Sequence, residues 1–467
     1  MKYRFIRKNL KTIRWVQKIE GIVREYLKTR FDSIANNKLK QTLLNALPFW
    51  LGALLTGVVA VIYAKLFLLA EQGTIYLYNL NKWLFFAITP LCFVVSWWLV
   101  HKYAPYARGS GIPQVSASIE LANPKKYHLV SKLLGFRILL IKIFSSLVMV
   151  FGGGVVGREG PTIQIAGSIF KKINDLLPEW YPKISKKNML ITGAASGLAA
   201  AFNTPLGGIV FAIEELTKTH FSFFKSALLT GVIIAGLTAL NILGPYLYLG
   251  YPTVNHLSWW VIFPVLIAAV LSGYLGCSMT RIILYVLKKK SVLQTNAKKI
   301  AYGVVGGLII AALGVLINME AFGSGKELMQ TALLTDNKYV EWYVPLLRFF
   351  GPVISFTNGG AGGVFAPSLS AGASIGSFVA EWFQLNGSNA NLIILCGMVS
   401  FLTGVTRSPF TSAILVLEMT TAETTIFYLM MAGLMANLVS SWVSKHSFYD
   451  QLKEQYMQEV DHEEVKA

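Results

Sequence analysis

Charged residues are scarce in this sequence. Asp, Glu, Lys and Arg account for 14% of its 467 residues, whereas hydrophobic residues account for 54%. Soluble domains carry about 25% charged residues, so the composition argues against an ordinary soluble protein. Apolar runs of about 20 residues, long enough to cross a hydrocarbon core, recur along the chain; they cover residues 49–70, 83–100, 133–151, 225–248, 258–287 and 424–443. Strands of a membrane barrel have about ten residues of alternating pattern, so the sequence predicts an all-α, multi-pass integral membrane protein.

Cysteine and histidine are also few. The three cysteines lie far apart in apolar segments, and the six histidines form no HxxxH or HExxH pair. Without a second Cys or His at ligand spacing, the pattern argues against a disulfide framework and against a metal site. We therefore expect neither a metal nor another cofactor, and we expect Cys92, Cys277 and Cys396 to pack in the core.

Acidic residues are outnumbered, with 23 Asp and Glu against 42 Lys and Arg. The excess does not indicate nucleic acid, because the basic clusters sit at the N-terminus and between apolar segments; they lie at 1–40, 171–172, 183–187, 288–290 and 298–299. Basic loops mark the cytoplasmic side, so we expect cytoplasmic N- and C-termini in a protein of the cell (inner) membrane. Residues 7–28 mix basic and apolar positions at near-helical spacing, which predicts either a helix on anionic membrane lipid or a solvated tail.

Gly and Pro interrupt many of the apolar segments. The interruptions lie at residues 107–115, 152–162, 200–208, 358–372 and 406–411. Broken backbone at membrane depth is tolerated only where it is buried in protein or lines a cavity. Broken helices in corresponding places of two halves are the best sequence indication of a transporter site.

The order of these interruptions indicates two related halves. A Gly-rich break that runs into Pro occurs at 152–162 and again at 359–367. About 45 residues after each break comes a similar segment, "FNTPLGGIVFAIEE" in the first case and "TRSPFTSAILVLEM" in the second. We therefore expect membrane repeats at 41–250 and 255–450, between the basic segment 1–40 and a short polar tail at 451–467 that leaves no room for a regulatory domain.

Three of the breaks share a design suited to binding an anion. "GSGIP" at 109–113, "GREGP" at 157–161 and "GGVFAP" at 362–367 each lead Gly-rich backbone into a Pro-bearing helix start. A helix N-terminus offers free N–H groups and about half a positive charge. Several such ends aimed at one point would form a dry anion site without a fixed cation, and would hold the ion weakly enough to release it.

Four residues are candidates to complete this site. Ser110 and Tyr449 offer hydroxyl donors, and Val364 and Phe365 offer backbone amides. Ordinary helix capping by Ser110 and interfacial anchoring by Tyr449 remain open alternatives.

Glu159 stands in the second break, where a carboxylate is costly and indicates function. Burial disfavours its charged form, whereas the helix amides and Arg158 favour it, so we expect it to exchange protons near neutral pH. When ionised it would occupy the anion site, and when protonated it would leave, which makes it both a gate and a proton carrier. The alternative is an ion pair with Arg158, although adjacent residues seldom face each other on a helix.

These motifs, in this order, resemble the CLC family of chloride channels and chloride/proton exchangers over about residues 45–450. The resemblance implies the family's inverted-repeat architecture of tilted and broken helices, and a homodimer with one pore per subunit. It makes Glu159 the external gating glutamate. The chloride ligands it implies are Ser110, Gly111, Glu159, Gly160, Val364, Phe365 and Tyr449.

The resemblance also assigns Glu215 as the internal proton-transfer glutamate. Family exchangers typically carry an acid at this position and many family channels do not, so Glu215 favours exchange. Alternatively, Glu214 or Glu215 caps a helix end or pairs with Lys142.

Ser110 favours chloride, because nitrate-specialised members often have Pro in its place. The segment "QVSASIE" after "GSGIP" has no acid before Glu120, which predicts weaker coupling if acids there assist the inner proton path.

We therefore expect a chloride/proton antiporter rather than an enzyme, with membrane lipid and no nucleic acid among its partners. A passive voltage- or pH-gated chloride channel of the same family is the main alternative. A sodium-coupled or organic-anion transporter on another broken-helix fold also remains open. "GGGVVG" at 152–157 matches a dinucleotide pattern only formally, because no soluble strand precedes it.

Overall fold

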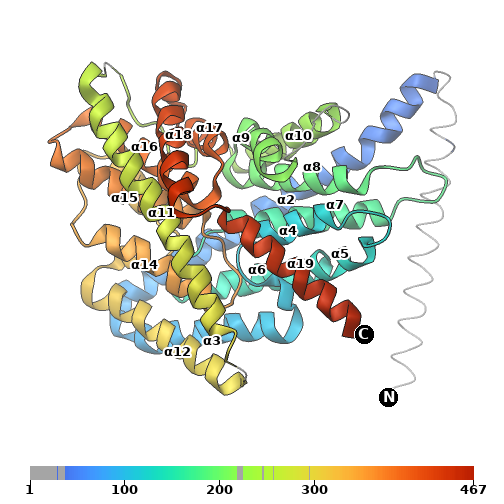
Figure 1. The fold of residues 1–467 in the computed structure, drawn as a ribbon, viewed down its shortest axis with the longest axis horizontal. Coiled ribbons are helices and arrows are strands. Elements are labelled where there is room, and N and C mark those ends of the chain that lie inside the picture. Colours follow the sequence, from blue (N-terminus) through green and yellow to red (C-terminus); the bar gives the residue numbers. More distant parts are fainter. Residues whose placement is uncertain are drawn as a thin grey trace.

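The computed structural model describes residue 29 and residues 37–217, 225–244, 247–255, 257–293 and 295–466. The basic segment 1–40 falls almost entirely outside these residues. Within the described part the chain is helical, and its only β-type contacts are two isolated bridges. Seven stretches of this part are long and apolar enough to cross a membrane. The prediction of an all-helical, multi-pass architecture is confirmed (Figure 1).

Long helices form the frame of the molecule. They are α2 (Asn37–Asn81), α3 (Phe85–Tyr103), α6 (Phe136–Phe151), α10 (Lys225–Leu243), α11 (Ile262–Lys290), α12 (Asn296–Ala312), α16 (Gly387–Thr406) and α18 (Ile426–Val443). Many of their apolar side chains are exposed, Trp442 and Phe427 by more than 80%. Such exposure fits a surface that meets lipid rather than water.

Shorter helices make up the rest of the described structure, and several of them begin at the interruptions. They are α4 (Ile112–Glu120), α5 (Tyr127–Leu133), α7 (Glu159–Asp175), α8 (Lys186–Phe202), α9 (Pro205–Phe211), α13 (Lys326–Leu334), α14 (Val344–Thr357), α15 (Phe365–Trp382), α17 (Pro409–Thr420) and α19 (Phe448–Lys466). Single turns join them: η1 (Lys82–Leu84), η2 (Pro105–Ala107), η3 (Ala212–Thr217), η4 (Trp259–Val261), η5 (Leu313–Ile317), η6 (Met319–Ala321) and η7 (Glu423–Thr425).

The interior is packed through small residues, as is common between helices in membranes. Helices α15 and α16 touch backbone to backbone: a methyl group on Gly372 would collide with the carbonyl of Gly397. All three cysteines are free and buried, as predicted. This close packing gives the short helices fixed positions beneath the lipid-facing frame.

Two carboxylates cap helices reciprocally between the two parts of the chain. Glu214, near the end of the "FNTPLGGIVFAIEE" segment, accepts hydrogen bonds from the Phe410 and Thr411 amides at the start of α17 (3.2 and 2.7 Å). Glu418, at the end of the matching later segment, accepts from the Leu206 and Gly207 amides at the start of α9 (3.0 and 2.6 Å). Both caps place a negative charge at a helix N-terminus, where it is stabilising.

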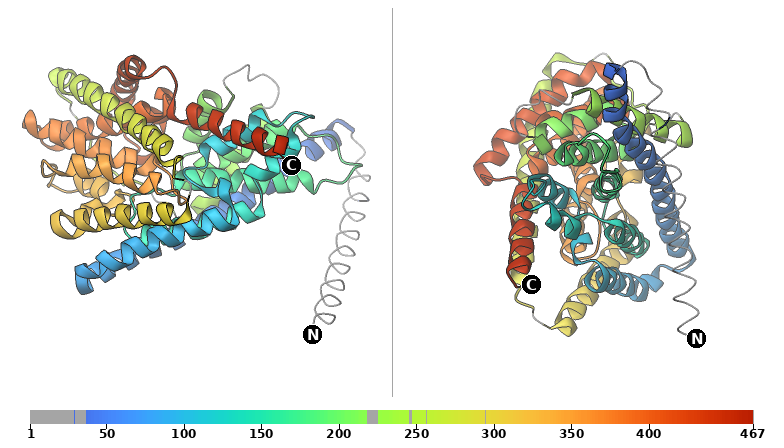
Figure 2. Two further views of the ribbon diagram at one scale, coloured as in Figure 1. Left: turned by 60° about the horizontal axis from the view of Figure 1, so that its bottom comes forward. Right: turned by 90° about the vertical axis from the view of Figure 1, so that its right-hand side faces the viewer.

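The C-terminal residues continue a helix rather than a loose tail. Residues 451–466 belong to α19, which lies against α4 (Figures 1 and 2). Four ion pairs hold α19 to the neighbouring segment, joining Arg108 to Glu459, Lys126 to Asp461, Lys132 to Glu463 and Glu120 to Lys453, and a hydrogen bond joins His128 to Glu464. Because Tyr449 lies in the first turn of α19, this docking also fixes the position of Tyr449.

Candidate functional site

The three Gly-rich breaks meet in the middle of the molecule. Gly157 and Gly363 exchange two backbone hydrogen bonds of 2.8 Å each. The Gly109 amide donates to the Gly360 carbonyl (2.8 Å), and the Gly362 amide donates to the Gly109 carbonyl (3.0 Å). Segments more than 200 residues apart in the sequence therefore form one continuous unit of paired backbone.

This pairing brings the N-termini of α4, α7 and α15 together. The helices begin at Ile112, Glu159 and Phe365. Each has a proline in its first turn, where the missing N–H costs no hydrogen bond. The free amides of the three first turns supply the positive ends of three helix dipoles. The geometry is therefore that of an anion site built from backbone.

Glycine is required where these ends approach most closely. Gly111 has a φ of 107°, and a methyl group there would lie 2.8 Å from the Gly160 carbonyl oxygen. A methyl group on Gly160 would collide with Ser110 Oγ. The residues predicted as chloride ligands from the first two motifs are therefore in direct contact.

Ser110 and Tyr449 lie together at this point, each 1% exposed. In the described part of the chain neither hydroxyl makes a hydrogen bond of standard geometry, although the two are close enough to interact. Ser110 does not cap α4, whose N-cap is Gly111 without a side-chain bond. Tyr449 is too buried for an interfacial anchor. Both hydroxyls are thus available to donate hydrogen bonds to a bound anion.

The Glu159 side chain points back onto the helix ends. The residue is 1% exposed, and its carboxylate lies beside its own amide and that of Ala366 in the first turn of α15. A side chain at Gly157 would collide with Glu159 Oε2 and lie 3.2 Å from the Ala366 nitrogen, so carboxylate and amide flank the same small space. The carboxylate therefore occupies a position that suits an anion.

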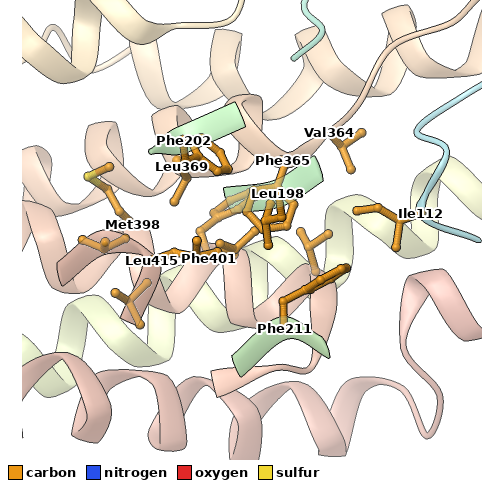
Figure 3. Close-up of a cluster of buried hydrophobic side chains, with 14 of the residues drawn as sticks. Ile112, Leu198, Phe202, Phe211, Val364, Phe365, Leu369, Met398, Phe401 and Leu415 are labelled. Carbon is orange, nitrogen blue, oxygen red and sulfur yellow. The ribbon is translucent and has the colours of Figure 1, made fainter. Parts of the chain in front are cut away.

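Apolar side chains form the walls around the helix ends. Ile112, Val364 and Phe365 are fully or almost fully buried. Figure 3 shows Phe365 and Leu198 at the centre of the cluster, with Phe202 on one side and Ile112 and Val364 toward the other. Because such walls exclude water, dipoles and hydroxyls act more strongly here than at a surface.

Lys142 is fully buried beside this loop, and from the sequence it was expected only as an alternative partner of Glu214 or Glu215. Its Nζ instead donates to the carbonyls of Ala107 (3.0 Å) and Gly109 (2.7 Å). It therefore fixes the loop that carries Ser110. A lysine within the apolar run 133–151 was the available signal.

Glu215 lies apart from the helix ends, on the η3 turn. It is 6% exposed, and its Oε2 accepts a hydrogen bond from Ser408 Oγ (2.8 Å). Glu214 next to it is committed to the cap of α17. Both Glu215 and Glu159 lie within electrostatic reach of Tyr449.

Cavities approach the site from two sides. One, of about 210 Å³, is lined by Glu71, Arg158, Glu159, Tyr248 and Lys326 among others. The other, of about 40 Å³, lies between Gly109 and α19, and its lining includes Arg108, Gly359 and Tyr456. The helix ends therefore separate a pocket beside α2 and α13 from a pocket beside α19.

The chain is similar in sequence to a known family of membrane proteins. The model of the family described as voltage gated chloride channel matches residues 92–441. The H(+)/Cl(-) exchange transporter ClcA of Cronobacter sakazakii is 29% identical, and the match covers 78% of this chain and 78% of that protein. The H(+)/Cl(-) exchange transporter ClcA of Citrobacter koseri is also 29% identical, and the match covers 83% of this chain and 82% of that protein.

Solved structures match the fold. A slow cyanobacterial Cl−/H+ antiporter superimposes with a TM-score of 0.78 at 24% identity, covering 89% of this chain and 98% of that one. A CLC-type fluoride/proton antiporter gives 0.72 at 20% identity with the same coverage. At these identities the likeness confirms the fold, with its many helices and its breaks.

Proposed function

Since the chain belongs to the voltage gated chloride channel family, CLC, we propose that it exchanges chloride for protons across the membrane. The position of Glu159 carries this proposal, because its carboxylate lies at the meeting point of the helix N-termini. An ionised carboxylate there competes with an anion, whereas a protonated one loses most of its attraction to the amides. Each protonation then frees the site for an anion and moves a proton, so one group gates the path and couples the two ions.

Chloride is the anion that the site suits best. Its donors are neutral amides and hydroxyls, which bind a monovalent ion weakly enough for release. The ligands we propose are Ser110, Gly111, Gly160, Val364, Phe365 and Tyr449, with Glu159 as their competitor. Both ClcA relatives are named for H(+)/Cl(-) exchange. One matched structure is a fluoride/proton antiporter, but the full "GSGIP" and "GREGP" motifs favour chloride here.

Glu215 is the proton-transfer residue that we propose on the side facing the cytoplasm. It is buried, and its carboxylate accepts a hydrogen bond from the Ser408 hydroxyl. The carboxylate of Glu214, by contrast, is committed to the α17 cap. Protons would pass between Glu215 and Glu159 near Tyr449.

Paired flux measurements test this function directly. In liposomes that contain the purified protein, an imposed chloride gradient alone is expected to drive protons uphill, recorded with chloride and pH electrodes. Chloride flux without proton movement would instead indicate the passive channel. Sodium-dependent flux that ignores chloride would indicate a transporter of another kind.

We also place the protein in the cell membrane as a homodimer, with each subunit holding its own pore and with both termini in the cytoplasm. The resemblance to the family supports the dimer, and the basic segments support the orientation. Single-molecule photobleaching of subunits that carry one dye each is expected to show two steps. One-step bleaching at full labelling would contradict the dimer.

A further inference from the structure

Tyr248 lies against the gate, although it belongs to none of the motifs. It follows α10 in the described segment 247–255 and is 2% exposed. Its hydroxyl donates to Glu159 Oε1 across 3.4 Å. It also lines the 210 Å³ cavity together with Glu159 and Arg158. Tyr248 therefore lies beside the carboxylate in the wall of this pocket.

Packing holds the Tyr248 ring in place from several elements. Its carbonyl accepts a hydrogen bond from Gln330 Nε2 on α13 (3.1 Å), and the next amide, of Leu249, donates to the Met419 carbonyl (3.2 Å). The ring meets Phe202 edge to face, with centroids 5.0 Å apart. With the backbone held at Tyr248 and at Leu249 and with the ring packed, the hydroxyl is directed at Glu159 without a large entropic cost.

Two cations lie over the same ring. The Lys326 ammonium is 4.9 Å and the Arg158 guanidinium 5.9 Å from its centroid. A cation over an aromatic face is attracted to the ring's electrons. Both cations also draw electron density from the phenol, which strengthens its O–H as a donor to a carboxylate.

We propose that Tyr248 is a positioning residue for the gate, whose hydroxyl stabilises the ionised Glu159 carboxylate in the anion site. This inference rests on the gating role proposed for Glu159. Hydrogen bonds to an ionised acceptor are roughly twice as strong as those to a neutral one, so Tyr248 favours the closed, deprotonated state. Its contact is long, and its effect is accordingly moderate.

Other charged and titratable groups also influence the protonation of Glu159, so the test variant must leave them unchanged. Besides Tyr248, the titratable and charged groups that face it or line its cavity are Arg158 directly before α7, Tyr63, Lys65 and Glu71 on α2, Lys326 on α13 and Tyr449 on α19. Tyr248→Phe keeps the ring, its contact with Phe202 and both cation contacts. It removes the hydroxyl alone.

The experiment measures chloride flux from liposomes between pH 4.5 and 7.5 for wild type and Tyr248→Phe. Without the hydroxyl, the ionised gate is less stable, so it protonates at higher pH. We expect the pH of half-maximal flux to rise by about half a unit, which corresponds to about threefold more flux at pH 7.5. At pH 4.5, where Glu159 is protonated in both proteins, the two fluxes should agree.

Two further variants separate this role from a structural one. Tyr251→Phe removes a hydroxyl from a neighbouring tyrosine that is 68% exposed, and its pH profile should match wild type. In a Glu159→Gln background, Tyr248→Phe should change nothing, because the hydroxyl acts through the carboxylate. An unshifted Tyr248→Phe profile, an equal shift in Tyr251→Phe, or an effect in the Glu159→Gln background would each overturn the proposal. Since the readout is chloride flux, failure of proton coupling would be seen separately, in the paired measurement on wild type.

Discussion

Replacing Glu159 with glutamine is expected to leave chloride flux intact while removing its pH dependence and its coupling to protons. Glutamine has almost the same shape but carries no charge, so it cannot compete with an anion for the ends of α7 and α15. It also cannot carry a proton. Chloride flux should therefore stay constant between pH 4.5 and 7.5, and proton movement should fall to the level of protein-free liposomes.

Chloride binding offers a second measurement on the same variant. With the competing carboxylate removed, calorimetric titration should show tighter chloride binding to Glu159→Gln than to wild type at pH 7.5. Adding Ser110→Ala to that variant should weaken the binding again, because a buried donor is lost.

Glu71→Gln is the matched control for Glu159→Gln. Glu71 lines the same 210 Å³ cavity, but its carboxylate accepts hydrogen bonds from the Ser324 amide and hydroxyl (3.1 and 2.6 Å) and lies away from the helix ends. The same neutralisation there should preserve coupling. Flux that still varies with pH in Glu159→Gln would show that another group is the gate.

The meeting of the three breaks was predictable from the sequence because each break has a recognisable local sequence pattern. Gly-rich backbone followed by Pro marks a helix start wherever it occurs, and burial of several such starts in a membrane requires that they satisfy one another. Gly109, Gly157 and Gly363 do so by direct pairing. The candidate residues Ser110 and Glu159 could be named because they lie inside these motifs.

Residues that act from outside the motifs carried no such signal. Tyr248 is one of 20 tyrosines, and only tertiary contacts with Gln330 and Phe202 direct it to the gate. Lys142 stood out in an apolar run, but its carbonyl partners lie more than 30 residues away in the chain. Contacts between distant segments depend on how helices pack, which local pattern does not encode.

The distinction between Glu214 and Glu215 shows the same limit. Adjacent acids in "IEE" are equivalent in local pattern, and either could cap a helix. The π-helical turn of η3 directs them differently, so that Glu214 reaches the amides of α17 and Glu215 reaches Ser408. Only the fold distinguishes Glu214, which caps a helix, from Glu215, the candidate for proton transfer. This difference can be tested by mutation.

Glu215→Gln is expected to abolish proton movement while chloride still passes. Glutamine keeps an oxygen that can accept from Ser408 Oγ, so the η3 turn should remain folded. It cannot bind and release a proton, so protons from the cytoplasmic side would no longer reach Glu159. In liposomes under a chloride gradient, chloride efflux should persist and uphill proton movement should disappear.

Glu214→Gln provides the contrast, because it makes the same substitution one residue away. Loss of the charged cap on α17 should destabilise the protein by about 1 kcal/mol, seen as a lower midpoint of thermal unfolding in detergent. Proton coupling should survive, since Glu214 is committed to the Phe410 and Thr411 amides. Continued proton pumping by Glu215→Gln would exclude Glu215 from the relay. Loss of pumping in both variants would instead show that the η3 turn as a whole, rather than the Glu215 carboxylate, is what coupling requires.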